Sequence, residues 1–217
     1  MNVMNVFNQK GFQELKATIT FDEVYKNLNN LIIPYKYNKE LLSYYEYRRK
    51  IISQQGFTIL TQEWINEFAK WIDNRKCLEI MSGCGSLSKV LKDRDVDIIA
   101  TDNFTWSSDT YNWNHNKNYW TDIENIDCIE AIEKYKDRDV IIMSWAYMDD
   151  TAYRCLLKMR EVNPDMVMIV IGEDWGGCTA NDDFFEAIED ISNEEIQKID
   201  SKIPRWVGTN DHMMLVK

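Results

Sequence analysis

Proline, histidine and cysteine are scarce in this sequence of 217 residues, which has three prolines, two histidines and five cysteines. The cysteines, at positions 77, 84, 128, 155 and 178, form no CxxC pair, and His115 and His212 are far apart. These spacings argue against a structural zinc site and against a disulfide scaffold, so we expect no bound metal. Reduced thiols are typical of a cytoplasmic protein.

Long apolar runs are also missing. No apolar stretch approaches the roughly 20 residues that a membrane-spanning helix requires. The first residues, MNVMNVFNQKGFQ, lack the cationic and apolar regions of a secretion signal. We therefore expect a cytoplasmic protein, a monomer without membrane association.

Basic side chains are in deficit, with 25 Lys and Arg against 36 Asp and Glu, for a formal net charge of −11. Binding to a phosphate backbone depends on clustered cations, so this balance argues against a nucleic-acid partner. What the chain does have is apolar residues, 45% of the total, enough for a hydrophobic core.

The first 75 residues contain little glycine or proline and are predicted to be helical. A Thr61 cap precedes an apolar stripe at helical spacing, formed by Trp64, Ile65, Phe68, Trp71 and Ile72. We therefore divide the chain into an N-terminal helical extension, residues 1–75, packed on a core domain of residues 76–217.

From residue 77 onward, short apolar runs alternate with amphipathic stretches. The predicted strands are Cys77–Met81, Val96–Ala100, Val140–Ser144 and Met166–Gly172. The predicted helices are Leu87–Lys92, Asp127–Lys136, Thr151–Val162 and Ala180–Ile191. This alternation predicts an α/β fold with a parallel sheet covered on both faces, and residues 206–216 predict a closing antiparallel hairpin.

The stretch "CLEIMSGCGSLSKVL" places Ser82–Gly85 between the first predicted strand and the first predicted helix of this domain. In open α/β sheets, ligands bind at the carboxyl ends of strands, and glycine lets the backbone approach a ligand closely. Asp102 ends the second predicted strand, about 20 residues further on, where a carboxylate can accept hydrogen bonds from ribose hydroxyls. Together these features predict a nucleotide site.

The residues around the turn discriminate between nucleotides. A dinucleotide fingerprint requires a third glycine where this chain has Ser88, and it places a pyrophosphate on the helix N-terminus. Glu79 lies directly before the turn, and its carboxylate would repel a pyrophosphate but suits a cationic ligand. This contrast favours S-adenosylmethionine, which carries an amino group and a sulfonium and no phosphate.

The segments "LEIMSGCGSLS" and "DIIATD" resemble those of the class I S-adenosylmethionine-dependent methyltransferases, whose first motif is roughly E/D-x-G-x-G-x-G. Glu79, Gly83 and Gly85 match that motif, whereas Met81 stands in place of its first glycine. The resemblance implies a Rossmann-like, mostly parallel seven-stranded sheet with S-adenosyl-L-methionine as cofactor.

The resemblance also implies a set of site residues. Asp102 would hold the ribose, Asp127 would receive the adenine amino group, and Cys128 would offer its backbone N–H. The implied cofactor-binding residues are Glu79, Met81, Ser82, Gly83, Gly85, Asp102, Asn103, Asp127, Cys128, Ser144 and Trp145. Tyr147 would lie with Ser144 and Trp145 beside the reactive methyl group.

Several of these residues have a plain structural alternative. Asp127 is equally compatible with an N-cap of the following helix, and the two glycines with a tight turn alone. Glu79 can be a surface acid at a strand edge. Cys84 fits a packing role better than a nucleophile, because no histidine is close to it in sequence.

Three segments are candidates for acceptor binding. The loop "NFTWSSDTYNWNHNKNYW" carries aromatic residues that either line a pocket or cover the sheet edge. In "GEDWGGCTANDDFF", Glu173 or Asp174 can orient or deprotonate a nucleophile, and Thr179 with Asp182 resembles a capping box. The basic, tyrosine-rich stretch Tyr35–Lys50 fits an anionic substrate or a packed helix face.

The function expected from these features is methyl transfer from S-adenosylmethionine to a small molecule or a protein side chain, with Glu173, Asp174 and Tyr147 as catalytic candidates. A methyltransferase-like binding module without catalysis is the main alternative. A nucleic-acid methyltransferase is disfavoured, because the chain has no Pro-Cys pair and Ser144-Trp-Ala-Tyr147 lacks both prolines of the DNA amino-methylating box. Ser88 and Glu79 disfavour a nicotinamide-dependent oxidoreductase.

Overall fold

The structure, a computed structural model, describes residues 48–49, 51–108, 119–206 and 208–217. The expectations for residues 1–47, and for the middle of the aromatic loop, lie outside this part of the chain. Within it, no helix combines the length and the apolar character needed to cross a bilayer.

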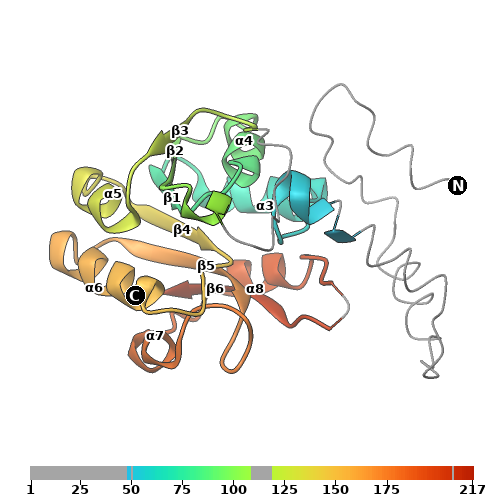
Figure 1. The fold of residues 1–217 in the computed structure, drawn as a ribbon. Coiled ribbons are helices and arrows are strands. Elements are labelled where there is room, and N and C mark those ends of the chain that lie inside the picture. The colour runs from blue at the N-terminus through green and yellow to red at the C-terminus, as the bar shows by residue number, and fades with distance from the viewer. Residues whose placement is uncertain (1–47, 50, 109–118, 207) are drawn as a thin grey trace, which may run out of the picture.

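A six-stranded sheet forms the centre of the described chain, in the order β3-β2-β1-β4-β5-β6 (Figure 1). Its strands are β1 (Cys77–Ile80), β2 (Ile98–Asp102), β3 (Ile123–Asn125), β4 (Val140–Ser144), β5 (Val167–Glu173) and β6 (Asp211–Val216). The first five run parallel and β6 runs antiparallel to β5. This order is that of a Rossmann-like sheet, so the α/β fold is confirmed.

The prediction of seven strands was wrong by one in the described residues, because the closing hairpin is not formed. Of its two expected strands, only β6 is present. Trp206 is instead buried, and its indole N–H donates to the carbonyl of Phe57 at 2.6 Å. The segment before β6 therefore packs against the main chain at Phe57 and does not pair as a strand of the sheet.

The helices of the described chain are α3 (Gln62–Ile72), α4 (Ser86–Lys92), α5 (Cys128–Lys134), α6 (Thr151–Val162), α7 (Asp182–Ala187) and α8 (Glu194–Asp200), with a 3-10 helix, η2 (Thr105–Ser108).

The helix predicted over residues 180–191 is α7, and the predicted extent was wrong. Ile188 leaves the helix, and Glu189 exchanges main-chain hydrogen bonds with Lys217, 2.8 and 2.9 Å long, beside the end of β6. The helix also begins after Asn181, which caps it in place of Thr179.

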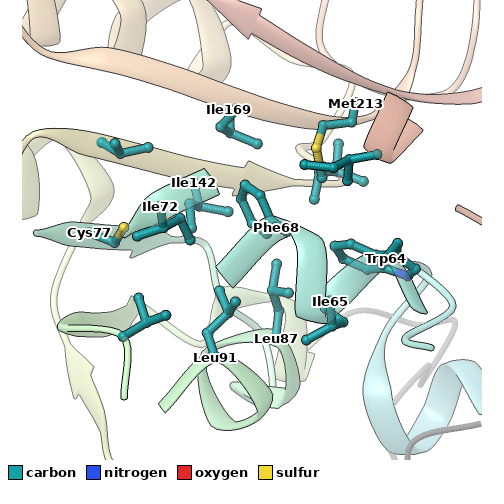
Figure 2. Close-up of a cluster of buried hydrophobic side chains, with 14 of the residues drawn as sticks. Trp64, Ile65, Phe68, Ile72, Cys77, Leu87, Leu91, Ile142, Ile169 and Met213 are labelled. Atoms are coloured by element: carbon teal, nitrogen blue, oxygen red, sulfur yellow. The ribbon is translucent and has the colours of Figure 1, made fainter. Parts of the chain in front are cut away.

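Alternate residues of each strand face opposite sides, which produces two separate cores. One core joins β1, β4 and β5 to α3, α4 and α8, and the other joins the same strands to α5, α6 and α7. Figure 2 shows Phe68 and Ile72 of α3 pointing into the first core with Ile142 and Ile169 of the sheet. Helices thus cover both faces, as expected, and leave the strand ends free to carry loops.

The apolar stripe predicted before residue 75 is α3, and four of its residues, Trp64, Ile65, Phe68 and Ile72, are fully buried. Helix α3 begins after Thr61 as expected, although the Thr61 side chain makes no capping hydrogen bond. Ahead of it, residues 48–49 and 51–55 are helical. The domain boundary at residue 75 stays a prediction.

Candidate functional site

The candidate site lies at the carboxyl ends of β1 and β4, which are neighbours in the sheet although β2 and β3 separate them in sequence. The strand order reverses at this point, where open α/β sheets bind ligands. Met81 follows β1 and Trp145 follows β4, and both have φ of 53°. A non-glycine residue in this left-handed region costs about 1–3 kcal/mol, and such strain concentrates at functional sites.

The two glycines of the turn have different structural roles, although both are left-handed, with φ of 59° at Gly83 and 73° at Gly85. A Cβ at Gly85 would lie 2.9 Å from Cγ2 of Thr121 and 3.0 Å from Cδ1 of Ile123, so this glycine permits close packing. A Cβ at Gly83 would meet no atom within 4 Å. The main chain at Gly83 is therefore the part of the turn that a ligand can approach.

Glu79 is 2% exposed and lies under the start of α4. Its Oε2 accepts hydrogen bonds from the main-chain N–H of Ser88, at 3.0 Å, and from the Ser88 hydroxyl. Because the N-cap residue of α4, Gly85, has no side chain, Glu79 satisfies a free N–H of the first helical turn. Burial raises the pKa of Glu79 to about 7, although the hydrogen bonds from Ser88 act in the opposite direction.

Asp102 ends β2 and joins it to the glycine turn. Its Oδ2 accepts from the N–H of Gly83 at 2.7 Å. Its Oδ1 accepts from the N–H of Phe104, at 2.6 Å, and from the indole N–H of Trp106, at 3.0 Å. Burial raises the pKa of Asp102, while the main-chain hydrogen bonds lower it. The structure therefore brings Glu79, Gly83 and Asp102 together at one turn.

The other residues expected at the nucleoside make local contacts. Asn103 is exposed, and its Oδ1 accepts from the hydroxyl of Thr105 at 2.9 Å. Asp127 caps α5, accepting from the N–H of Ile129 at 2.9 Å, and Cys128 is the buried first residue of that helix. The capping interpretation of Asp127 is therefore observed, and its contact with adenine stays a prediction.

The end of β4 and the residue after it pack against residues that precede α3. The Ser144 hydroxyl lies 2.8 Å from that of Thr58, and the Trp145 ring stacks on Phe57 with centroids 4.6 Å apart. The Trp145 indole N–H also donates to Oδ2 of Asp211 at 3.3 Å. Tyr147, the expected catalytic tyrosine, is 49% exposed at the edge of this group.

The two acids at the carboxyl end of β5, Glu173 and Asp174, differ in what they can do. Glu173 is buried, and its carboxylate accepts from the N–H groups of Cys178, at 2.7 Å, and Asn210, at 3.0 Å. Burial raises the pKa of Glu173, but these N–H groups outweigh it and hold the pKa below its usual value. Asp174 is half-buried, with Oδ2 3.9 Å from Nε2 of His212. Glu173 thus organises two loops, whereas Asp174 is available to a ligand.

Sequence reasoning missed a segment that we name the strap, residues 54–58, which lies across the glycine turn and the end of β4. The Gln54 carbonyl accepts from the indole N–H of Trp120 at 2.6 Å and from the Cys84 thiol at 3.5 Å. The Gln55 carbonyl accepts from the Ser86 hydroxyl. In sequence, the only hint is Gly56 between a helical stretch and the stripe of α3; its φ is 90°.

Two further chemistries find no support in the described residues. Burial raises the pKa of the Cys84 thiol to about 11, so it is a packing residue rather than a nucleophile. The described part of the chain contains no group of three or more His, Cys, Asp or Glu that could hold a metal ion.

The sequence matches no family model and no curated protein. Among solved structures, the fold is similar to a variant of MtNAS in complex with S-adenosylmethionine (12% identity, TM-score 0.46, covering 90% of this chain and 70% of that chain). It is also similar to a TehB-like SAM-dependent methyltransferase from Corynebacterium glutamicum (14%, 0.43, 83% and 99%) and to a protein of the NADB-Rossmann superfamily from Streptococcus agalactiae (13%, 0.43, 72% and 68%). Similarity at this level identifies neither a cofactor nor a reaction for this chain.

Proposed function

We propose that this protein is an S-adenosylmethionine-dependent methyltransferase that acts on a small molecule or a protein side chain. One observation carries the proposal: the Glu79 carboxylate accepts a hydrogen bond from the main-chain N–H of Ser88 in the first turn of α4. In a dinucleotide-binding fold the pyrophosphate sits at the N-terminus of this helix. A buried acid in that place excludes a pyrophosphate and favours a nucleoside that carries positive charge.

The described residues fit such a ligand in three respects. The turn is open at Gly83, so a ligand can approach the backbone there. Asp102 is fixed by its hydrogen bond to Gly83, and its Oδ2 keeps a second lone pair for a ribose hydroxyl. Buried Glu79, with its pKa raised to about 7, gains a favourable partner when a cation binds near it.

When bound, S-adenosylmethionine supplies an electrophilic methyl group on a sulfonium. The contribution of the protein is then mainly positioning, which can account for several kcal/mol of a reaction barrier, ~7 or more in well-oriented cases. We assign ribose binding to Asp102, and placement of the acceptor to Trp145 and Tyr147 at the end of β4.

A proton must leave most acceptors on methylation. Asp174 suits this role better than Glu173, because it is half-buried and makes a 3.4 Å contact with the side-chain amide of Asn210 rather than buried main-chain bonds. Glu173, with its lowered pKa and two N–H donors, is a poor proton acceptor.

Isothermal titration calorimetry of the purified protein tests the proposal. S-adenosylmethionine and S-adenosylhomocysteine should bind, and NAD and NADH should not. Binding of NADH with no binding of the two sulfur nucleosides would identify a dinucleotide site and refute the proposal.

A second candidate function is a domain that binds the cofactor without transferring methyl groups. It is favoured because the Glu173 carboxylate already accepts two main-chain hydrogen bonds and is therefore a poor catalytic base. Incubation with methyl-labelled S-adenosylmethionine and a cell extract separates the two. Label in an acceptor indicates transfer, whereas tight binding without any labelled product indicates the binding domain.

A further inference from the structure

We propose that Gln55 of the strap is a cofactor-binding residue, whose side-chain amide donates a hydrogen bond to the carboxylate of the methionine moiety of S-adenosylmethionine. This inference rests on the proposed function and adds to it the group that recognises the only anionic part of that ligand.

The position of Gln55 is fixed by hydrogen bonds to its own main-chain carbonyl and to that of Gln54. Its own carbonyl accepts from the hydroxyl of Ser86, the first residue of α4, and the Gln54 carbonyl accepts from the Cys84 thiol at 3.5 Å. Cys84 and Ser86 flank Gly85 in the turn, so the strap is held against the nucleotide-binding turn itself. In Figure 1 the blue and cyan segment that precedes α3 lies beside α3, at one end of the sheet.

The Gln55 side chain is buried, and its amide nitrogen is left without a hydrogen-bond acceptor. Gln55 is 6% exposed, and among the described residues its Nε2 has no hydrogen-bond partner. The buried hydroxyl of Ser82, which opens the same turn, also has no partner within the described chain. A buried donor that is left unpaired destabilises the folded protein. Two such groups beside one turn indicate a ligand that completes their hydrogen bonds.

The chemistry of the surroundings identifies the ligand group. Glu79 and Asp102 both contact the turn or the helix that follows it and make this region acidic, so a carboxylate bound here needs neutral or basic donors of its own. The lysines of α4 are engaged elsewhere: Lys89 pairs with Asp93 at 2.6 Å, and Lys92 donates to the Thr121 hydroxyl at 2.9 Å. Arg48, a cation of the helical stretch before the strap, has its guanidinium 5.9 Å from the centre of the Trp206 ring and lowers the pKa of Glu173, so we place it at the Glu173 end of the site. Gln55, which is held at the turn itself, is the donor that we assign to this carboxylate.

The test compares S-adenosylmethionine with decarboxylated S-adenosylmethionine, which lacks only the carboxylate, by calorimetric titration of the full chain. Gln55→Met should weaken binding of S-adenosylmethionine by about 10-fold or more, the scale of a hydrogen bond to a charged group. The same variant should bind the decarboxylated ligand as the parent does. Gln54→Met is the matched control, because it keeps the carbonyl that contacts Trp120 and Cys84, and it should bind both ligands normally.

The melting temperature of the free proteins separates a binding role from a structural one. Because methionine removes an unpaired buried donor, Gln55→Met should melt at or above the temperature of the parent. If it does not fold, Gln55→Asn, whose amide is shorter by one methylene, should show the same selective loss.

Equal weakening of both ligands, or full retention of the preference for S-adenosylmethionine, would overturn the proposal for Gln55 while leaving the cofactor assignment intact. A parent protein that binds neither ligand would instead refute the proposed function, and the inference with it.

Discussion

Glu79 and Ser88 are joined by two hydrogen bonds, from the main-chain N–H of Ser88 at 3.0 Å and from its hydroxyl, both to the same carboxylate oxygen. This pair links the first strand to the first helix after the glycine turn. Ser88 stands where a dinucleotide fingerprint has its third glycine, which allows close packing of helix on strand; here the hydroxyl at this position donates to the buried acid.

The raised pKa of Glu79 predicts a pH dependence of stability. The pKa of Glu79 in the folded protein, about 7, exceeds the ordinary glutamate value of 4.5, so between these two pH values the folded protein binds a proton that the unfolded chain does not. The contribution of Glu79 to the free energy of unfolding is therefore largest at low pH and falls as pH rises through 7. Between pH 5.5 and 8 the fall should be roughly 2 kcal/mol. Urea denaturation at these two pH values should show a smaller fall in Glu79→Gln; an identical fall would contradict the prediction.

Replacement of Asp102 should weaken cofactor binding and also lower the stability of the fold. Asp102→Ala removes the acceptor of Gly83, Phe104 and Trp106. We expect S-adenosylmethionine affinity to fall by about 1.5–3 kcal/mol and the free energy of unfolding by about 1–3 kcal/mol. Calorimetry and urea denaturation measure the two effects, and unchanged affinity in a folded variant would show that Asp102 does not hold the ribose.

The two glycines of the turn form a matched pair. Gly85→Ala should lower stability strongly, because its Cβ would lie 2.9 Å from Thr121 in addition to the left-handed strain. Gly83→Ala meets no atom, so it should lower the free energy of unfolding only by the strain, about 1 kcal/mol, while abolishing ligand binding. Normal cofactor affinity in Gly83→Ala would mean that the ligand does not approach the turn there.

Substitutions of the two acids at the end of β5 should separate an effect on catalysis from an effect on folding. Asp174→Asn should reduce methyl transfer by about 100-fold or more, the scale of general-base assistance, without a change in melting temperature. Glu173→Gln should lower the melting temperature, because an amide nitrogen replaces one oxygen that accepts from Cys178 or Asn210. A large loss of activity in a stable Glu173→Gln protein would reverse these roles.

The alternating pattern of residues 77–172 predicted the parallel sheet, because buried strands and amphipathic helices have distinct periods. Helix α6 was predicted with its observed bounds, Thr151–Val162. Glu79 and Asp102 could be singled out because each is an acid in or at the end of an apolar run, a local signal, and the structure places both at the glycine turn; their contacts with a cofactor stay predictions.

Other features depend on contacts between distant residues, which one sequence does not display. The strap is held by Trp120 and Trp206, 66 and 149 residues away from their acceptors. Likewise, α7 ends before Ile188, and Glu189 pairs with Lys217, a residue far away in sequence. Glu173 resembled a catalytic base in sequence, and only the structure shows its main-chain partners.

The most direct test of the central claim, that a buried acid at the glycine turn selects a cationic nucleoside, is the rise in melting temperature that S-adenosylmethionine causes in the parent and in Glu79→Gln. The substitution is nearly isosteric, so it isolates the charge. We predict that saturating ligand raises the melting temperature of the parent clearly and that of the variant far less. Equal shifts in the two proteins would remove Glu79 from the site and contradict the account.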